Sequence, residues 1–358
     1  MNAREQLQTV LATLRNRGIG NEPPDAQERA AQAVALARRE QEVDLLGALL
    51  IEQGMLALGR GEQTLAEDIL QEAVRVLGRG KHEREHVRAL HALGLALYTR
   101  GEYLQALDTW LKGMELAVAE GLREDCARAW VGVGKVYHAF GHTQSALHFH
   151  EQAWQLAERV GDPTLSCEVA INLASTAYRL HHLDDALHYL ALAEVWLKGP
   201  VQHPLWSAEV LSYYGLIYFE QHDYAKAEAA LNSARALNQH HRNLWGEGHV
   251  LLHLGRTYYQ LQRIPEALDC LNQANEIAVR GGLAHLVQQA EALLAQISME
   301  TGDYRQALTH QKRLHASVIA THQDEGQTMR LSRANEKRLA QLEHQLSVER
   351  IRLQFNQP

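Results

Sequence analysis

The motif with the clearest chemical meaning is His82-Glu-Arg-Glu-His86, which satisfies the pattern H-E-x-x-H. In that pattern, two imidazoles one helical turn apart bind zinc and the glutamate activates a water molecule. The match is weakly specific because the chain holds 21 histidines. It also starts directly after Gly78-Arg-Gly80-Lys, where a helix is expected to begin, and no third ligand follows at metzincin spacing. A zinc-dependent hydrolase is therefore kept only as an alternative.

Several other histidines come in close pairs, which could bind a metal or simply fill a polar surface. The pairs are His138 and His142, His148 and His150, His181 and His182, and His240 and His241. Surface filling explains most of them, and a metal site is the other interpretation. The sequence has no Gly-rich phosphate loop, no G-x-S-x-G and no plausible Cys-His pair. We expect a protein without enzymatic activity, cofactor or metal.

Charge and cysteine content narrow the class of partner and compartment. The net charge is -8, from 35 Lys and Arg against 43 Asp and Glu, so no general field attracts nucleic acid or an anionic membrane. Cys126, Cys167 and Cys270 are far apart and odd in number, which fits a reducing cytosol. The first residues lack the apolar core of a signal peptide, and no window approaches a membrane span. We expect a cytoplasmic protein.

An internal repeat of about 40 residues organises the chain. Eight alanines keep its register: Ala26, Ala66, Ala106, Ala146, Ala186, Ala227, Ala267 and Ala307. Twelve residues before this alanine stands a small residue in most copies: Gly54, Gly94, Gly134, Ala174, Gly215, Gly255 and Ala295. Small residues let two antiparallel helices approach closely, while Leu, Tyr and Trp at helical spacing fill the seams. The pattern predicts helix pairs at 43–59 and 62–78, 84–100 and 103–120, and 123–140 and 143–160, continuing through residue 300.

The segment Leu93-Gly-Leu-Ala-Leu-Tyr-Thr-Arg-Gly-Glu-Tyr-Leu-Gln-Ala-Leu107 resembles the tetratricopeptide repeat family. The resemblance implies an all-α, right-handed superhelical solenoid over residues 43–311. Residues 1–42 form a degenerate capping copy, with Leu14 at its small position and its turn near Gly20. The 40-residue period is longer than the usual 34 and is similar to that of bacterial signalling arrays. With its C-terminal helix, the arrangement is similar to the N-terminal sensor module of diguanylate cyclase-type signalling proteins.

In this family, the first helix of each pair lines a concave groove that binds peptides. The family's groove positions carry over to Arg88, His91, Tyr98, Arg128, Lys135, His138, Asn172, Ser175, Tyr178, Arg179, Tyr213, His253, Arg256 and Tyr259. Arginine binds carboxylates through two parallel hydrogen bonds and tyrosine supplies contact area, so we expect a peptide with acidic side chains or a free C-terminal carboxylate. Alternatively, the tyrosines pack between helices and the charges are solvated. A small molecule or a phosphate group bound by Arg128, Lys135 and Arg179 is a further alternative.

Residues 312–358 form a C-terminal extension with a different pattern. Leu339, Leu342, Leu346 and Leu353 make a short, imperfect heptad seam. This seam predicts either a coiled coil that forms a homodimer or transmits a signal, or a helix that caps the exposed end of the solenoid.

Together these features predict a non-catalytic scaffold or sensor module of bacterial signalling. It would bind a protein or peptide in its groove and couple that binding to the C-terminal helix. The alternative is a structural adaptor that dimerises through that helix.

Overall fold

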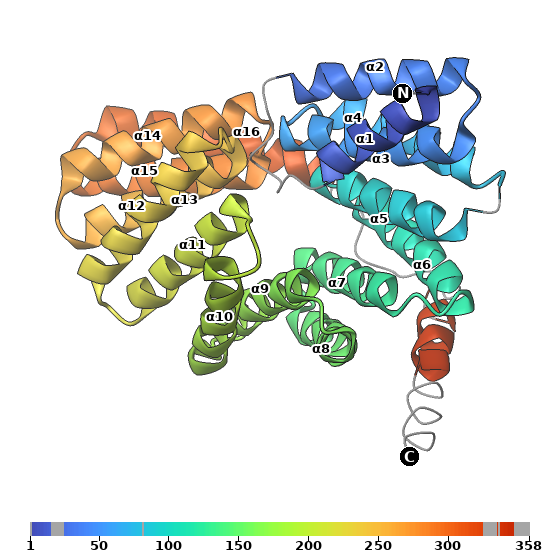
Figure 1. Cartoon of the computed structure of the whole chain (residues 1–358). Helices are drawn as coiled ribbons and strands as arrows, with labels where there is room; N and C mark the ends of the chain where they lie inside the picture. Colours follow the sequence, from blue (N-terminus) through green and yellow to red (C-terminus); the bar gives the residue numbers. More distant parts are fainter. Residues whose placement is uncertain (1, 16–24, 81, 325–334, 336, 347–358) are drawn as a thin grey trace. The chain divides into compact units, whose positions relative to one another are not determined.

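The computed structural model describes residues 2–15, 25–80, 82–324, 335 and 337–346, and all regular structure in these residues is helical (Figure 1). The chain divides into two compact units. Unit 1 comprises Met1–His182, Lys198–Gln202 and Leu331–Pro358, and unit 2 comprises Leu183–Leu197 and His203–Arg330. Each unit is therefore described by itself.

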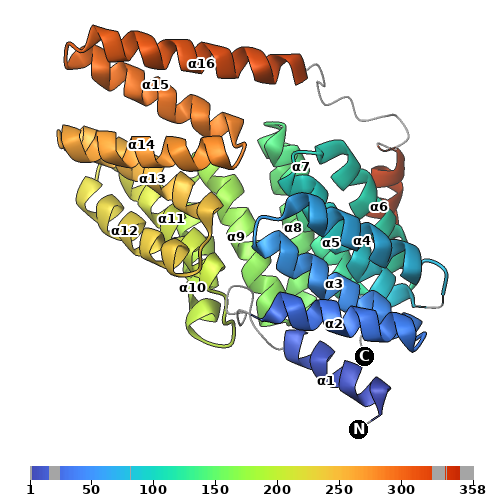
Figure 2. The same cartoon turned by 90° about the horizontal axis from the view of Figure 1, so that it is seen from above.

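Unit 1 contains nine of the sixteen long helices that the described residues form. They are α1 (Ala3–Arg15), α2 (Ala26–Arg39), α3 (Val43–Gly59), α4 (Gln63–Leu77), α5 (Glu83–Thr99), α6 (Tyr103–Ala119), α7 (Arg123–Ala139), α8 (Thr143–Val160) and α9 (Pro163–Arg179). The pairs α3–α4, α5–α6 and α7–α8 lie within a residue or two of the predicted ranges, and each pair packs closely (Figure 2).

Unit 2 continues the alternation of helices. It contains α10 (Leu183–Lys198), α11 (Pro204–Glu220), α12 (Tyr224–His240), α13 (Leu244–Gln260), α14 (Ile264–Arg280), α15 (Ala284–Glu300) and α16 (Tyr304–Asp324). The pairs α11–α12, α13–α14 and α15–α16 repeat the arrangement of unit 1. The predicted all-α repeat solenoid is thus confirmed.

The small residue of each pair contacts a large side chain on the partner helix. A Cβ added to Gly54, Gly215 or Gly255 would lie within 3.0 Å of the leucine four residues after the repeat's alanine, namely Leu70, Leu231 or Leu271. In the α5–α6 pair that position is Trp110, which is 1% exposed and donates its indole N–H to the carbonyl oxygen of His91 at 3.2 Å. Glycine is required here because the indole occupies the space that a side chain would fill.

Tight turns join the two helices of each pair. Gly101, between α5 and α6, has φ +84°, and His222 and Gln262 adopt the same left-handed conformation at equivalent turns. Glycine enters this region freely, whereas other residues adopt it at some cost. Some helix starts also have a local cause. α9 begins where the Asp162 carboxylate accepts the Leu165 N–H at 2.9 Å and Pro163 fits the first turn.

The two ends of the chain differ from the expectation in detail. The turn predicted near Gly20 lies outside the described residues. α16 continues to Asp324, past the expected end of the solenoid at residue 311. A further helix, formed by Asn335 and residues 337–346 and called the tail helix below, belongs to unit 1, whereas the last pair α15–α16 belongs to unit 2. That the C-terminal helix caps the solenoid stays a prediction.

The leucine seam is placed in part. Leu339 and Leu342 are buried within the chain, while Leu353 lies outside the described residues. Dimerisation through Leu339, Leu342, Leu346 and Leu353 stays a prediction.

Replacing Gly94 by alanine should destabilise the protein by about 1–3 kcal/mol, because the added Cβ would lie within 3.0 Å of the buried Trp110 indole. Gly59, on the preceding pair, has no atom within 4 Å of an added Cβ. Gly59→Ala should be neutral or stabilising, since alanine favours the helix. Urea unfolding of the two variants measures the difference. Equal stabilities would contradict the close-packing requirement.

His150 occupies the large-residue position of the α7–α8 pair, where a Cβ on Gly134 would meet its ring. The side chain is 1% exposed, and its Nδ1 lies 2.9 Å from the Thr176 hydroxyl oxygen. The Thr176 hydroxyl donates to the carbonyl oxygen of Asn172, so it accepts the Nδ1–H. Burial first, and then His138 and Lys135, lower the pKa of His150 to about 3. The buried imidazole is therefore neutral at pH 7.

This depressed pKa predicts acid sensitivity. Between pH 6.5 and about 3 the unfolded chain binds a proton at His150 that the native chain does not bind, so the free energy of unfolding falls with falling pH. His150→Leu introduces the residue found at the equivalent positions Leu70 and Leu271. The variant should lose about 2 kcal/mol less of its free energy of unfolding between pH 7 and pH 5 than the unaltered chain does. Denaturant unfolding at both pH values measures it, with exposed His188→Leu as the control. An unchanged pH dependence in His150→Leu would contradict the burial argument.

Candidate functional site

The candidate site is a cavity of about 660 Å³ in unit 1, lined by the odd-numbered helices α1, α3, α5 and α7. This volume lies in the range of small-ligand sites. Its apolar lining residues are Leu14, Ile51, Met55, Leu56 and Ala92, and its polar lining residues are Arg15, Glu52, Arg84, Glu85, Arg88, His91, Glu124, Asp125 and Arg128. The cavity lining thus combines apolar side chains with closely spaced charges.

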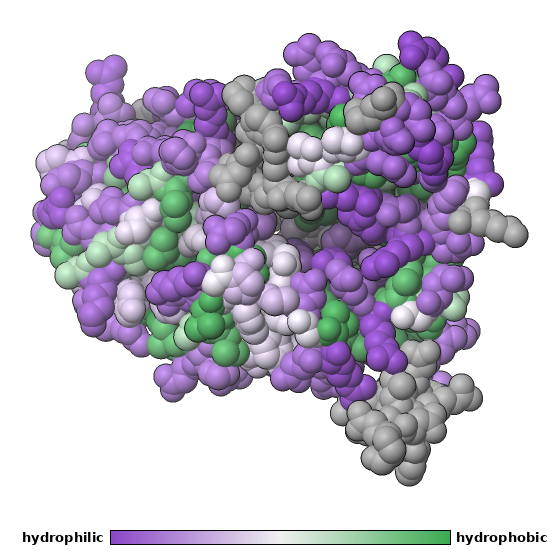
Figure 3. All heavy atoms as spheres, in the orientation of Figure 1, coloured by the Kyte–Doolittle hydropathy of each residue, from purple (hydrophilic) through white to green (hydrophobic). Residues whose placement is uncertain are grey.

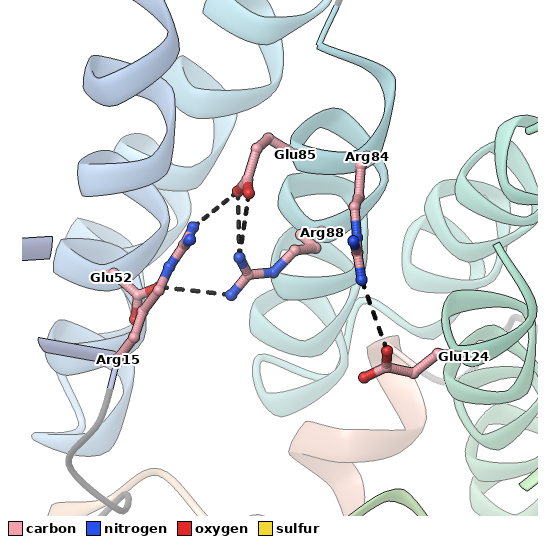
Figure 4. Close-up of polar contacts among 6 residues, drawn as sticks. All are labelled: Arg15, Glu52, Arg84, Glu85, Arg88 and Glu124. Atoms are coloured by element: carbon pink, nitrogen blue, oxygen red, sulfur yellow. Dashed lines mark hydrogen bonds and ion pairs between the residues drawn. The ribbon is translucent and has the colours of Figure 1, made fainter. Parts of the chain in front are cut away.

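One set of ion pairs among the lining residues extends from α1 to α5 (Figure 4). Arg15 Nε lies 3.1 Å from Glu52 Oε1, and Arg15 Nη2 lies 2.9 Å from Glu85 Oε2. Arg88 lies 3.2 Å from Glu85 and 3.6 Å from Glu52. Each arginine therefore faces two carboxylates that come from different helices.

A second set continues from α5 through α7 to α9. Arg84 lies 3.9 Å from Glu124, and Arg128 lies 2.6 Å from Glu124 and 4.0 Å from Glu168. Glu168 also lies 3.8 Å from Lys135 Nζ. We call the two sets together the charge ladder: Arg15, Glu52, Arg84, Glu85, Arg88, Glu124, Arg128, Lys135 and Glu168.

Local sequence explains where these charges stand. Glu85 and Glu124 lie in the first turns of α5 and α7, where carboxylates interact favourably with the positive end of the helix dipole. Arg88 and Arg128 follow about one turn later and are equivalent positions 40 residues apart. Helix starts at a fixed period therefore bring carboxylates and guanidinium groups of neighbouring pairs together.

The charge ladder is close to electrically balanced. Its Arg and Lys side chains number five and its glutamates number four, and Asp125 adds a buried carboxyl to the cavity wall. Burial raises the pKa of Asp125, and Arg128 opposes this shift. Burial lowers the pKa of His91 to about 4, so that imidazole is neutral, and its Nδ1 has no hydrogen-bond partner among the described residues.

Of the predicted groove residues, Arg88, His91 and Arg128 line the cavity. Lys135 joins them through Glu168. Tyr98 instead packs against Tyr103 and Trp110, with ring centroids 5.3 and 6.1 Å apart, which favours the interpretation as an inter-helix packing residue. The cavity therefore contains only part of the predicted set.

The remaining predicted residues of unit 1 have other surroundings. Asn172 donates its side-chain N–H to the carbonyl oxygen of Glu168 at 2.8 Å, within its own helix. Ser175 is buried at 7% exposure, and its place in the groove stays a prediction. Tyr178 is half-buried and Arg179 exposed, and burial, followed by the charge of Arg179, lowers the pKa of His138 to about 4.

Tyr213, His253, Arg256 and Tyr259 belong to unit 2. Arg256 lies over the Phe219 ring at 5.2 Å, and Tyr259 donates its hydroxyl to Glu300 at 2.5 Å. Burial, with Arg256 and His249 adding to it, lowers the pKa of His253 to about 3. This group is aromatic and imidazole-rich, without the alternating charges of unit 1.

Sequence reasoning missed Arg15, Glu52, Arg84, Glu85, Glu124, Asp125 and Glu168. A signal was present, because charged residues recur at the repeat spacing in Arg84 and Glu124, Glu85 and Asp125, and Arg88, Arg128 and Glu168. Only the contact between neighbouring pairs shows that they form ion pairs.

The H-E-x-x-H match gains no support from its place in the fold. His82 precedes α5 as its N-cap residue, with φ −126° and ψ 47°, so it does not share a helical face with His86. Within the described ranges, no group of three or more His, Cys, Asp and Glu side chains is arranged to hold a metal ion.

Comparison with known proteins identifies the repeat. A sequence model of the tetratricopeptide repeat family matches residues 85–159, which span most of α5 to α8. The fold is a tetratricopeptide-like solenoid. No curated protein matches the sequence.

Solved structures show the same fold at low identity. A Rap protein complexed with Competence and Sporulation Factor is 15% identical, with a TM-score of 0.58 over 89% of this chain and 99% of that chain. The Rap conjugation gene regulator of plasmid pLS20, in complex with the Phr* peptide, is 15% identical, with a TM-score of 0.59 over 74% and 70%. Cut9 of the APC/C hetero-tetramer Cut9-Hcn1 is 15% identical, with a TM-score of 0.64 over 94% and 55%.

The side chains over α2 are mostly hydrophilic (Figure 3), as expected for an exposed helix of a chain that is 22% charged. No helix in the part of the chain that the structure describes is both long and apolar enough to cross a membrane.

The ladder should contribute little to stability. Arg88 is 35% exposed and Arg15 30%, and ion pairs with such access to water contribute about 0–1 kcal/mol each. Arg88→Ala should therefore lower the free energy of unfolding by less than about 1 kcal/mol, as should the control Arg38→Ala, which removes the Arg38–Glu72 pair of α2 and α4. Urea unfolding measures both. A loss of 3 kcal/mol or more in Arg88→Ala alone would make the ladder a structural element.

Proposed function

We propose that this protein is a non-catalytic scaffold that binds a peptide, or an extended segment of a protein, in the cavity of unit 1. The observation that carries the proposal is the charge ladder, seven members of which line the cavity together with apolar side chains. Such a surface can bind the side chains and the backbone of a peptide together.

The balanced ladder changes the kind of peptide that fits. A purely acidic peptide would meet Glu52, Glu85 and Glu124 as well as the arginines. A peptide with both acidic and basic side chains can exchange partners with the ladder, its carboxylates pairing with Arg88 and Arg128 and its amines pairing with the glutamates. We therefore infer a mixed-charge ligand, in place of the acidic peptide or free carboxylate expected from the arginines alone.

The accessibility of the ladder supports this exchange. Arg15, Arg88, Glu85 and Glu124 keep between 27% and 35% of their side chains exposed. Partly exposed pairs are weak in water, so a ligand can replace one partner at small cost.

The comparisons support a peptide ligand by analogy, since one solenoid of similar fold was solved with the Phr* peptide. A sensor role in signalling is part of the proposal. The pairs α5–α6 and α7–α8 line the cavity with their first helices, and their second helices carry the tail helix. A ligand that shifts α5 against α7 would shift α6 against α8, and the tail helix would report the change.

A displayed library of random 12-residue peptides, selected on the full chain, tests the proposal. Selected peptides should carry both charge signs, and Arg88→Ala combined with Arg128→Ala should weaken their binding about 10- to 100-fold, because charge-assisted hydrogen bonds are lost. Fluorescence anisotropy of one labelled peptide measures the affinity.

Arg38→Ala serves as the control because Arg38 pairs with Glu72 on α2 and α4, helices that do not line the cavity. Its affinity should match that of the unaltered chain. Selected peptides whose binding survives Arg88→Ala with Arg128→Ala would place the ligand elsewhere and refute the site.

A further inference from the structure

Unit 1 carries a second surface of defined chemistry, on α6 and α8, the helices that do not line the cavity. We call it the α6–α8 surface: Asp108, Glu115 and Leu116 on α6, and His148 and Leu156 on α8. This surface is amphipathic. It carries two carboxylates about two helical turns apart on α6, an imidazole on α8 and two leucines.

The tail helix lies beside α6 in both views of the molecule (Figures 1 and 2). Arg338 bridges the two carboxylates, with Nε 2.6 Å from Glu115 Oε1 and Nη1 2.8 Å from Asp108 Oδ1. Glu343, five residues further on, lies 3.0 Å from His148 Nε2. The tail helix therefore makes two polar contacts, one with the acidic pair of α6 and one with the imidazole of α8.

The leucines of the tail helix are buried beside these polar contacts. Leu339 is 5% exposed and Leu342 is 2% exposed. Leu346 packs against the buried cluster of Val87, Ala117 and Cys126, as do Leu116 of α6 and Leu156 of α8. The leucine seam for which the sequence predicts a coiled coil or a cap is thus buried within the chain over Leu339 and Leu342, and the contacts of Arg338 and Glu343 fix the direction and register of the tail helix.

We propose that the α6–α8 surface is a docking site for amphipathic helices, and that the tail helix is a tethered occupant which a helix of a partner protein displaces. The partner helix carries the pattern of Arg338 to Leu346, namely Arg-Leu-x-x-Leu-Glu-x-x-Leu. Its arginine pairs with Asp108 and Glu115, its glutamate pairs with His148, and its leucines fill the seam.

Charge complementarity argues for this partner. In a chain of net charge -8, the acidic pair on α6 favours a basic residue at one end of the helix and disfavours an acidic residue there. The imidazole selects a carboxylate at the other end. A helix bound in the reverse direction would place its arginine at His148 and its glutamate at the carboxylates. The surface therefore selects the direction of the helix as well as its amphipathic pattern.

The described contacts also make the tail helix exchangeable. Its charged contacts are exposed to water, with Glu115 at 45% and His148 at 51%, so they add specificity more than stability. A single helix of about twelve residues is marginal without a partner surface. Docking therefore depends on three leucines, and the tether raises the local concentration of the tail helix over that of a free competitor.

The proposal is independent of ligand binding in the cavity, and its test uses the full chain. The probe is a fluorescein-labelled peptide of residues 331–350, titrated by anisotropy. Leu342→Asp in the chain weakens its own tail helix, so the peptide should bind this variant at least 10-fold more tightly than the unaltered chain. Adding Glu115→Arg should cost at least 10-fold in affinity, and a peptide with Arg338→Glu should recover most of that loss.

Asp68→Arg serves as the matched control, because it makes the same charge change at an exposed position of α4. It should leave the peptide affinity unchanged. Arg338→Glu in the chain is a second way to release the tail helix without altering the leucines, and it too should open the surface. Circular dichroism of each variant reports its folding.

Three results would overturn the proposal. The first is equal binding of a scrambled peptide, and the second is peptide affinity that Glu115→Arg leaves unchanged. The third is an unaltered chain that is a dimer by light scattering and becomes a monomer when the peptide is added, because the occupant would then be the tail of a second copy.

Discussion

The close approach of two helices over a small residue is the constraint on which the rest of this structure depends. Gly94 lets α5 and α6 approach until the Trp110 indole fills the gap, and Gly132 on α7 accepts the other face of the same indole. One buried ring therefore fixes the spacing within a pair and to the next pair. Where the position holds His150, the same contact buries an imidazole and makes the stability depend on pH.

Fixed spacing places different chemistry on the two sets of helices. The first turns of α5 and α7 present carboxylates and arginines at the repeat period, which become the charge ladder because neighbouring pairs are held at one distance. The second helices, α6 and α8, present Asp108, Glu115 and His148 to the tail helix. The proposed ligand and the tail helix would thus contact the same two pairs.

The period alone predicted the helix pairs of residues 43–160 to within a residue or two, because small residues and turns recur in register. It did not predict the ladder, because the pairing of Glu85 with Arg15 or of Arg128 with Glu168 depends on the angle between successive pairs. Family positions predicted Arg88, His91 and Arg128, which line the cavity, but not their carboxylate partners. The leucine seam predicted that the tail helix packs against another surface. Heptad spacing alone does not show whether that surface is the tail of a second chain or the helices α6 and α8 of the same chain.

Hydrogen exchange of the full chain, followed by mass spectrometry with and without a selected peptide, tests the central claim most directly, because it reports which helices a ligand protects. Binding in the cavity predicts slower exchange in α3, α5 and α7, with the first turns of α5 and α7 most affected because Glu85 and Glu124 lie there. Protection confined to α11 to α15, or saturating peptide without any protection of α5 and α7, would contradict the account.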